Sequence, residues 1–76
     1  MVFEKVRSIV AKVLEKSLDC IKMDSEFVRD LGADSIGVVE MIFAINDEFG
    51  IEVPDEVADK IISVGDVVRY IESVKK

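Results

Sequence analysis

Apolar residues recur at helical spacing in the first part of the chain. Between residues 2 and 16, charged side chains alternate with a hydrophobic stripe that consists of Val2, Phe3, Val6, Ile9, Val10, Val13 and Leu14. This period predicts an amphipathic helix over about residues 2–16. Residues 35–49 carry apolar side chains around well over half of a helical circumference. That stretch predicts a central helix that is packed on several sides.

A further apolar stripe lies near the end of the chain. It consists of Val64, Val67, Val68, Ile71 and Val74. The stripe predicts the buried face of a last helix. Ser63 and Asp66 stand three residues apart at its start, which resembles a capping box. Between the central and last helices, Gly50 is typical of a helix stop, and Pro54 is typical of the first turn of a short helix.

Residues 17–34 have no regular period and predict a long loop. We expect four apolar residues to anchor this loop to the core: Ile21, Phe27, Val28 and Leu31. The run Ile51-Glu52-Val53 alternates like a strand, but it is too short to build a sheet, and we expect an extended loop there. The sequence thus predicts an all-α fold in a single domain over residues 1–76. That fold is a small four-helix bundle with three main helices, one short helix and a long first loop.

Charge is distributed unevenly along the chain. The formal net charge is −6, yet residues 23–59 hold eleven acidic side chains and one basic one, a net of −10, between two ends of +2 each. The negative electrostatic field of this acidic middle region repels nucleic-acid phosphates. It favours partners with basic surfaces, whose association it accelerates. The simpler alternative is that the acids only keep a small protein soluble.

The sequence also excludes several classes of protein. A single cysteine, Cys20, cannot form an internal disulfide and suits a reducing compartment. We expect its side chain to be partly buried as a small hydrophobe. There is no run of about 18 apolar residues and no visible secretory leader, so we expect a cytoplasmic protein without a membrane span.

Intrinsic catalysis is not expected from this composition. The chain has no histidine, and carboxylates on short amphipathic helices usually form solvated faces. Acid–base chemistry needs a concave, partly dry site instead. Asp24, Glu26 and Asp30 lack the central glycine and closing glutamate of a calcium loop. We therefore expect neither catalytic nor metal-binding residues.

The most informative run is Leu31-Gly32-Ala33-Asp34-Ser35-Ile36, where the loop gives way to the central helix. Gly32 permits a turn, and the carboxylate of Asp34 is suited to cap the first-turn amides. Ser35 would then be exposed on the opening turn, at the positive end of the helix dipole, where an anionic phosphoester is stabilised. The simpler reading is a serine that only makes local hydrogen bonds beside a helix cap.

This run and the segments around it resemble the acyl carrier proteins. Residues 27–31 are similar to that family's approach to its modified serine, residues 47–56 to its second loop, and residues 60–71 to its last helix and the lead-in. The resemblance covers nearly the whole chain and implies a phosphopantetheine arm on Ser35, added from coenzyme A by a phosphopantetheinyl transferase. The thiol of the arm would carry acyl groups as thioesters. Ser35 is then an attachment point, and the chemistry belongs to partner enzymes.

The resemblance also implies how partners and cargo are bound. The central helix is similar to the family's recognition helix, with acidic matches at Asp34, Glu40 and Asp47 and apolar matches at Ile36, Val39 and Phe43. The implied partners are acyl-handling enzymes with basic docking surfaces, and we expect a monomer. The acyl chain is expected to enter a slot between the helices, where each buried methylene is worth about 0.8 kcal/mol. The candidate lining residues are Phe27, Ile45, Ile61 and Ile62.

Two positions of the central helix depart from the fatty-acid-synthesis type. Gly37 and Asn46 stand where that type commonly has acids, and we count Gly37 among the candidate partner-binding residues. A glycine at position 37 resembles the pattern of D-alanyl carrier proteins, and the run Asp34-Ser35-Ile36 resembles that of peptidyl carriers. Gly32-Ala33 and residues 47–55, by contrast, resemble the fatty-acid-synthesis type. We therefore expect a function in fatty acid biosynthesis. The alternatives are a specialised carrier of a D-alanyl, peptidyl, polyketide or lipid-modification pathway, or an unmodified acidic helical interaction module.

Overall fold

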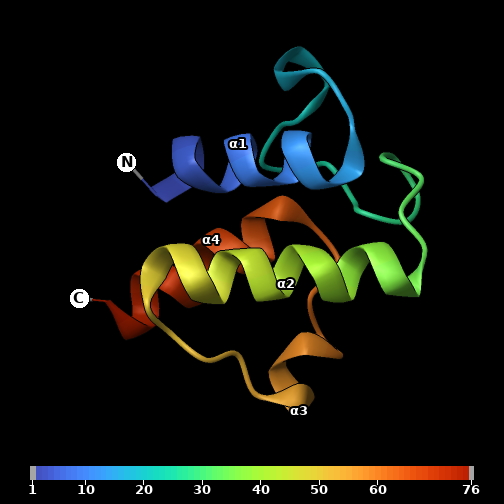
Figure 1. The fold of residues 1–76 in the computed structure, drawn as a ribbon. Helices are drawn as coiled ribbons and strands as arrows, with labels where there is room; N and C mark the ends of the chain where they lie inside the picture. The colour runs from blue at the N-terminus through green and yellow to red at the C-terminus, as the bar shows by residue number, and fades with distance from the viewer. Residues whose placement is uncertain (1, 76) are drawn as a thin grey trace.

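The computed structural model describes residues 2–75, and within them the chain is helical (Figure 1). Its elements, in order, are α1 (Val2–Leu14), the 3₁₀ helix η1 (Leu18–Cys20), α2 (Ser35–Phe49), α3 (Asp55–Ala58) and α4 (Val64–Val74). The described part of the chain has no strand; Glu26 and Ser63 form an isolated β-bridge, and residues 51–53 are irregular, as predicted. Pro54, expected in the first turn of the short helix, is instead the extended N-cap residue directly before α3. The prediction of an all-α fold with three main helices and one short helix is confirmed.

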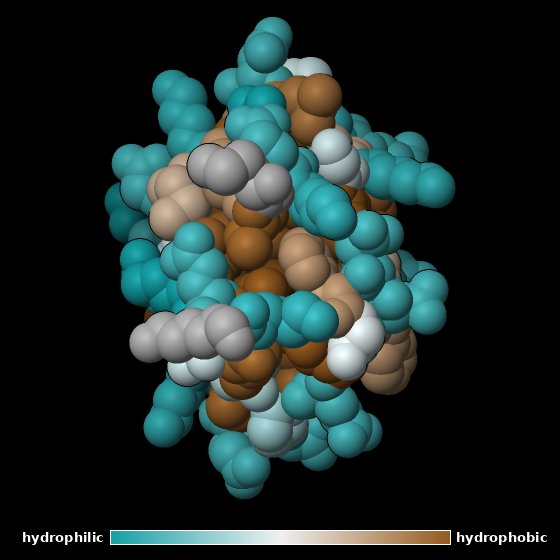
Figure 2. Space-filling model, turned by 90° about the vertical axis from the view of Figure 1, so that its left-hand side faces the viewer, coloured by the Kyte–Doolittle hydropathy of each residue, from teal (hydrophilic) through white to brown (hydrophobic). Residues whose placement is uncertain are grey.

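α1 and α2 run antiparallel, and α4 lies behind α2 in the view of Figure 1. The core draws on all three long helices and on the first loop. Its most deeply buried side chains are Val6, Val10, Ile21, Phe27, Met41, Ile45, Val64, Val67 and Ile71. Both termini lie at one end of the bundle, where Figure 2 shows apolar side chains in the middle of a hydrophilic surround. α2 begins at the opposite end, which separates its first turn from both termini.

α1 ends in a turn that places a non-glycine residue in the left-handed region. Glu15 has a φ of 57°, and the Lys16 N–H donates to the Ala11 carbonyl at 3.0 Å. This is a Schellman motif, in which the second residue beyond the helix bonds back to its last turn. The left-handed position of that motif is usually glycine, because an L side chain is strained there. Glu15 therefore holds stored strain at the end of α1.

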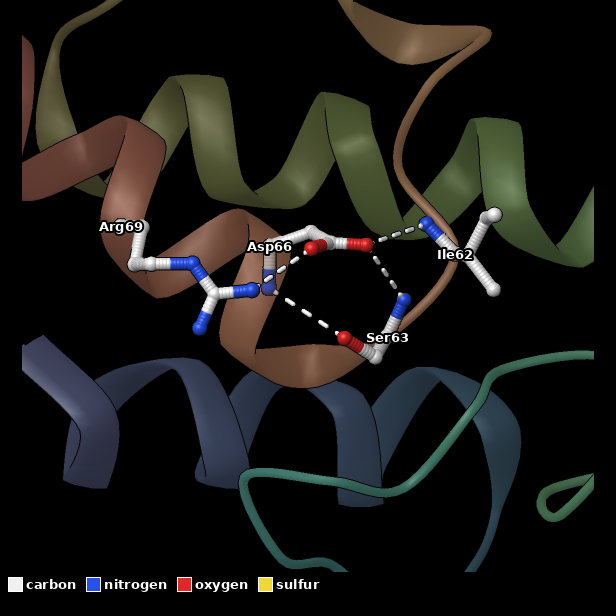
Figure 3. A network of polar contacts seen from close by, with 4 residues as sticks. All are labelled: Ile62, Ser63, Asp66 and Arg69. Atoms are coloured by element: carbon white, nitrogen blue, oxygen red, sulfur yellow. Dashed lines mark hydrogen bonds and ion pairs between the residues drawn. The ribbon is translucent and has the colours of Figure 1, made fainter.

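α4 begins with the capping box that the sequence predicts (Figure 3). The Ser63 Oγ accepts from the Asp66 N–H at 3.4 Å, and Asp66 Oδ2 accepts from the amides of Ile62 at 2.9 Å and Ser63 at 3.1 Å. The Arg69 guanidinium donates to the other Asp66 oxygen at 2.7 Å. The hydrogen bond from Ile62, together with those from Ser63 and Arg69, outweighs partial burial and lowers the pKa of Asp66.

The first loop is fastened to the start of α4 by backbone hydrogen bonds. The Val64 N–H donates to the Ser25 carbonyl at 2.9 Å, and the Gly65 N–H donates to the Met23 carbonyl at 2.8 Å. A Cβ atom at position 65 would lie 2.9 Å from that Met23 oxygen. The close approach of these two backbones therefore requires glycine at position 65.

Three of the four predicted loop anchors are confirmed and one is wrong. Ile21, Phe27 and Leu31 are almost completely buried, whereas Val28 is 65% exposed. Val28 lies in a turn directly after Phe27, so the two side chains point in different directions and only Phe27 reaches the core.

Two other expectations about burial are also wrong. The stripe predicts that Val74 continues the buried face of α4, but the residue is 46% exposed and is the last residue of the helix. Cys20 is exposed instead of partly buried. It lies at the end of η1, on the outside of the long loop, where the Ser17 hydroxyl donates to its sulfur at 3.4 Å.

Candidate functional site

α2 begins at a cap formed by Asp34. The carboxylate of Asp34 accepts a hydrogen bond from the Gly37 N–H at 2.7 Å, and its carbonyl accepts from the Val38 N–H at 3.0 Å. These two bonds make Asp34 the N-cap residue, as the sequence predicts. Ser35 is consequently the first residue of the helix, and its side chain is exposed.

The turn before this cap is held by buried residues. Leu31 and Ala33 are buried, and the Ala33 N–H donates to the Phe27 carbonyl at 2.9 Å. Between them, Gly32 has a φ of 68°, a conformation that L side chains rarely adopt. The loop is thus fixed on both sides of Gly32, which determines where Ser35 leaves the bundle.

An anionic phosphoester fits the position of Ser35. The first four amides of a helix have no acceptor inside the helix, and the aligned peptide dipoles give this end a partial positive charge. The Asp34 carboxylate satisfies only one of the four, that of Gly37, by its side chain. The exposed hydroxyl of Ser35 therefore lies next to donors that stabilise negative charge, and it is accessible to another protein.

One face of α2 exposes large apolar side chains next to acidic ones. Ile36, Val39 and Phe43 are 68%, 48% and 66% exposed. Glu40 and Asp47 are also exposed. They adjoin the apolar residues because positions three, four and seven apart share one side of a helix. We call these five residues the docking face; the sequence predicts all five as partner-binding residues.

Gly37 differs from the other predicted partner-binding residues. It is half-buried, and a Cβ atom there would lie 3.3 Å from Leu14 Cδ2 of α1 and 3.3 Å from Asp34 Oδ1. Position 37 thus faces α1, away from the docking face. Helical spacing gives the angle of Gly37 around α2, but it does not reveal on which side α1 packs.

The structure divides the predicted acyl-pocket residues between core and surface. Phe27 and Ile45 are each 1% exposed, and Ile61 is half-buried and packs against the same core. Ile62 is 59% exposed. It lines a hollow of ≈ 430 Å³ at the start of α4, and its carbonyl accepts from the Phe27 N–H at 3.0 Å. Phe27 and Ile45 therefore belong to the core and Ile61 packs against it, whereas the side chain of Ile62 lies outside the core.

An open hollow of ≈ 530 Å³ lies between α1 and α2, directly beside the docking face. Its lining consists of half-buried Ile9, Val13 and Ala44 and of exposed Lys12, Glu40, Asp47 and Glu48. We call it the α1–α2 hollow. The sequence predicts no site role for its α1 residues, for Ala44 or for Glu48. The spacing of Ile9, Lys12 and Val13 shows that they share a face, but only the packing shows that this face adjoins Glu40 and Asp47.

Two further properties of residues 2–75 bear on the function. Within this range, no three His, Cys, Asp or Glu side chains are grouped so that they could hold a metal ion. None of the helices described there has the length and apolar character needed to cross a membrane. The distinctive features of the described chain remain the exposed Ser35 and the docking face that follows it.

Comparisons with known proteins match the chain along nearly its whole length. The family model for the phosphopantetheine attachment site matches residues 4–71. The acyl carrier protein of Clostridium acetobutylicum is 56% identical over 73 residues, which cover 96% of this chain and 95% of that protein. The acyl carrier protein of Campylobacter hominis is 51% identical over 75 residues, which cover 99% and 95%. A solved structure from Mycobacterium tuberculosis, itself a proposed acyl carrier protein, is 28% identical and covers both chains completely with a TM-score of 0.89.

Proposed function

We propose a function from the premise that this chain belongs to the phosphopantetheine attachment family and, within it, to the acyl carrier proteins. It carries acyl groups on a covalently attached phosphopantetheine. We infer that it does so in fatty acid biosynthesis and that it catalyses no reaction itself. The support is the sequence identity of 51% and 56% to two acyl carrier proteins over nearly the full chain.

The attachment point in this proposal is Ser35. The observation that carries it is the exposed hydroxyl at the first residue of α2, directly after the Asp34 cap. A phosphopantetheinyl transferase would transfer the group from coenzyme A to this oxygen: the serine O–P bond forms as the pyrophosphate bond of coenzyme A breaks, the hydroxyl loses its proton, and 3′,5′-ADP leaves. When bound, the group supplies the thiol that holds acyl groups as thioesters. The chain itself supplies an accessible oxygen, a fixed position and a helix end that stabilises the negative charge of the phosphoester.

The partners are the transferase and acyl-handling enzymes with basic surfaces. Ile36, Val39 and Phe43 offer exposed apolar area for contact, and Glu40 and Asp47 offer negative charge to the same partner. Charges of this kind accelerate association and select the partner, while the apolar contacts supply affinity. The negative charge of Asp34, which adjoins Ser35, extends the acidic part of this surface to the attachment point.

The cargo is proposed to enter the core near Phe27 and Ile45, which belong to the buried core, and near Ile61, which packs against that core. Ile62, exposed beside Ile61, would lie at the mouth of that slot. Each methylene removed from water there is worth about 0.8 kcal/mol, which offsets the cost of parting the helices. We further propose that the protein works as a single-domain monomer in the cytoplasm, where the exposed thiol of Cys20 stays reduced.

Intact mass spectrometry tests this proposal. The unmodified protein is incubated with coenzyme A and a broad-specificity phosphopantetheinyl transferase, and then with an acyl-loading enzyme of fatty acid synthesis. We expect one added phosphopantetheine, followed by one acyl group that hydroxylamine releases, as it does from a thioester. If the protein never gains the mass of phosphopantetheine, it is an unmodified interaction module. A protein that gains the arm but accepts only aminoacyl or D-alanyl groups is a specialised carrier.

A further inference from the structure

We propose that the α1–α2 hollow receives an arginine side chain from the basic surface of a partner enzyme, so that α1 forms part of the recognition site. The proposal rests on the proposed carrier function, because it adds a contact to the docking face. It assigns a role in recognition to Lys12, Ile9 and Val13 of α1 and to Ala44 of α2, all of which line the hollow.

The charges of the hollow favour a cation. Glu48 is already paired with Lys5 across the two helices, at 3.9 Å. Glu40 and Asp47 form no ion pair with any residue between 2 and 75, and neither does Lys12. Two carboxylates without a counter-charge therefore line the hollow against one lysine, which leaves the excess of negative charge that an incoming guanidinium would neutralise.

The apolar part of the lining favours a long side chain. Ile9, Val13 and Ala44 are half-buried, so they present apolar surface along the hollow without closing it. The methylene groups of an arginine can cover such surface while the charged head stays near the carboxylates. Arginine suits this better than lysine, because its planar head carries five donors, is less strongly hydrated and can engage two carboxylates at once.

The hollow is also continuous with the docking face. Glu40 and Asp47 belong to both, because they line the hollow and lie beside the exposed apolar residues of α2. A partner that covers Phe43 therefore places its neighbouring side chains next to the hollow. Lys12 is a cation in the lining of the hollow, so it repels the incoming arginine of the partner. Its charge therefore sets how strongly the hollow attracts basic partners.

A pair of charge reversals on α1 tests the proposal. Lys12→Glu changes a residue that lines the hollow, and Lys16→Glu makes the same change at an exposed residue just beyond α1 and outside the hollow. The probe is a broad-specificity phosphopantetheinyl transferase with coenzyme A, and the readout is KM and kcat for arm attachment at low salt. We expect Lys12→Glu to lower KM by roughly threefold or more and Lys16→Glu to change it by less than about twofold. Equal effects of the two reversals would overturn the proposal.

Filling the hollow gives a second test that does not change charge. Ala44→Met adds volume to the apolar lining, and we expect KM to rise by roughly threefold or more while kcat and the thermal midpoint stay close to those of the unchanged protein. An unchanged KM in a folded Ala44→Met variant would contradict the proposal. If the unchanged protein gains no arm at all, the proposed carrier function fails; if it gains the arm and the α1 variants behave alike, only the role of the hollow fails.

Discussion

The carboxylate of Asp34 and the amide of Gly37 are joined by a 2.7 Å hydrogen bond that sets the first residue of α2. This bond ties a loop residue to the first turn of the helix, and Ser35 lies between its two ends. The left-handed Gly32 and the buried Ala33 fix the chain on the other side of Asp34. The attachment point is thus held by its neighbours in the backbone, although its own side chain is free.

Asp34→Ala removes the cap and is expected to destabilise the protein by about 1 kcal/mol. Asp34→Asn keeps an oxygen that accepts from the Gly37 amide, and asparagine caps a helix about as well as aspartate. We therefore expect the asparagine variant to retain most of the stability in urea unfolding at neutral pH. Equal losses in both variants would show that the charge of Asp34, and not its hydrogen bond, stabilises α2.

Glu15→Gly is expected to stabilise the protein by about 0.5–1 kcal/mol. Glu15 has a φ of 57° at the end of α1, where an L side chain is strained by about 1–2 kcal/mol and the entropic cost of glycine offsets part of the gain. The matched control is Lys16→Gly, at a neighbour without a positive φ, which should not stabilise. Thermal or chemical unfolding measures the stability of both variants. A Glu15→Gly variant that is less stable than the unchanged protein would contradict the claim that Glu15 is strained.

The capping box of α4 predicts a pH dependence of stability. The amide of Ile62 is the largest cause of the lowered pKa of Asp66, followed on the same side by Ser63 and Arg69. Folding therefore favours the ionised carboxylate. The stabilisation is fully present above the unfolded pKa of about 3.9 and is lost as the pH falls through the lowered folded pKa.

Asp66→Asn tests this dependence. We expect a loss of about 1 kcal/mol at neutral pH, because a charge-assisted cap is weakened, and a smaller difference from the unchanged protein in acid. Urea unfolding over the acid range measures it. Glu72→Gln, an exposed change on the same helix, should stay within about 0.5 kcal/mol throughout. A difference between Asp66→Asn and the unchanged protein that is constant with pH would argue against ionisation as its source.

Gly65→Ala is expected to destabilise the protein by about 1–2 kcal/mol. Alanine gains about 1 kcal/mol of helix propensity over glycine. The new Cβ, however, would lie 2.9 Å from the Met23 carbonyl oxygen, which is backbone and cannot rotate away. Relieving that contact costs about 1–3 kcal/mol and weakens the hydrogen bond between the two residues. A stabilised alanine variant in urea unfolding would show that the first loop moves aside freely.

Most of the fold follows from local patterns that the sequence displays. The cap at Asp34, the left-handed stop at Gly50 and the box of Ser63 and Asp66 are short-range features, and the structure confirms all three. The wrong predictions concern burial. Val28 and Val74 are apolar and lie near buried residues in the sequence, but whether such a side chain reaches the core depends on how distant elements pack.

The same distinction applies to the candidate site. Ser35 and the exposed stripe of α2 are visible in the sequence because they lie on one helix and its cap. The orientation of Gly37 toward Leu14 depends on the packing of α1 against α2. The same packing places Lys12 and the acids of α2 in the lining of one hollow. Periodicity gives the angle of each residue about its own axis, but it does not specify the neighbouring helix.

The most direct test of the account is the site of arm attachment. Ser35→Ala and Ser17→Ala, which changes another exposed serine, are incubated with coenzyme A and the transferase and compared with the unchanged protein by intact mass. We expect one phosphopantetheine on the unchanged protein and on Ser17→Ala and none on Ser35→Ala, whose stability should stay within about 0.5 kcal/mol. A folded Ser35→Ala variant that still gains the arm would contradict the central claim.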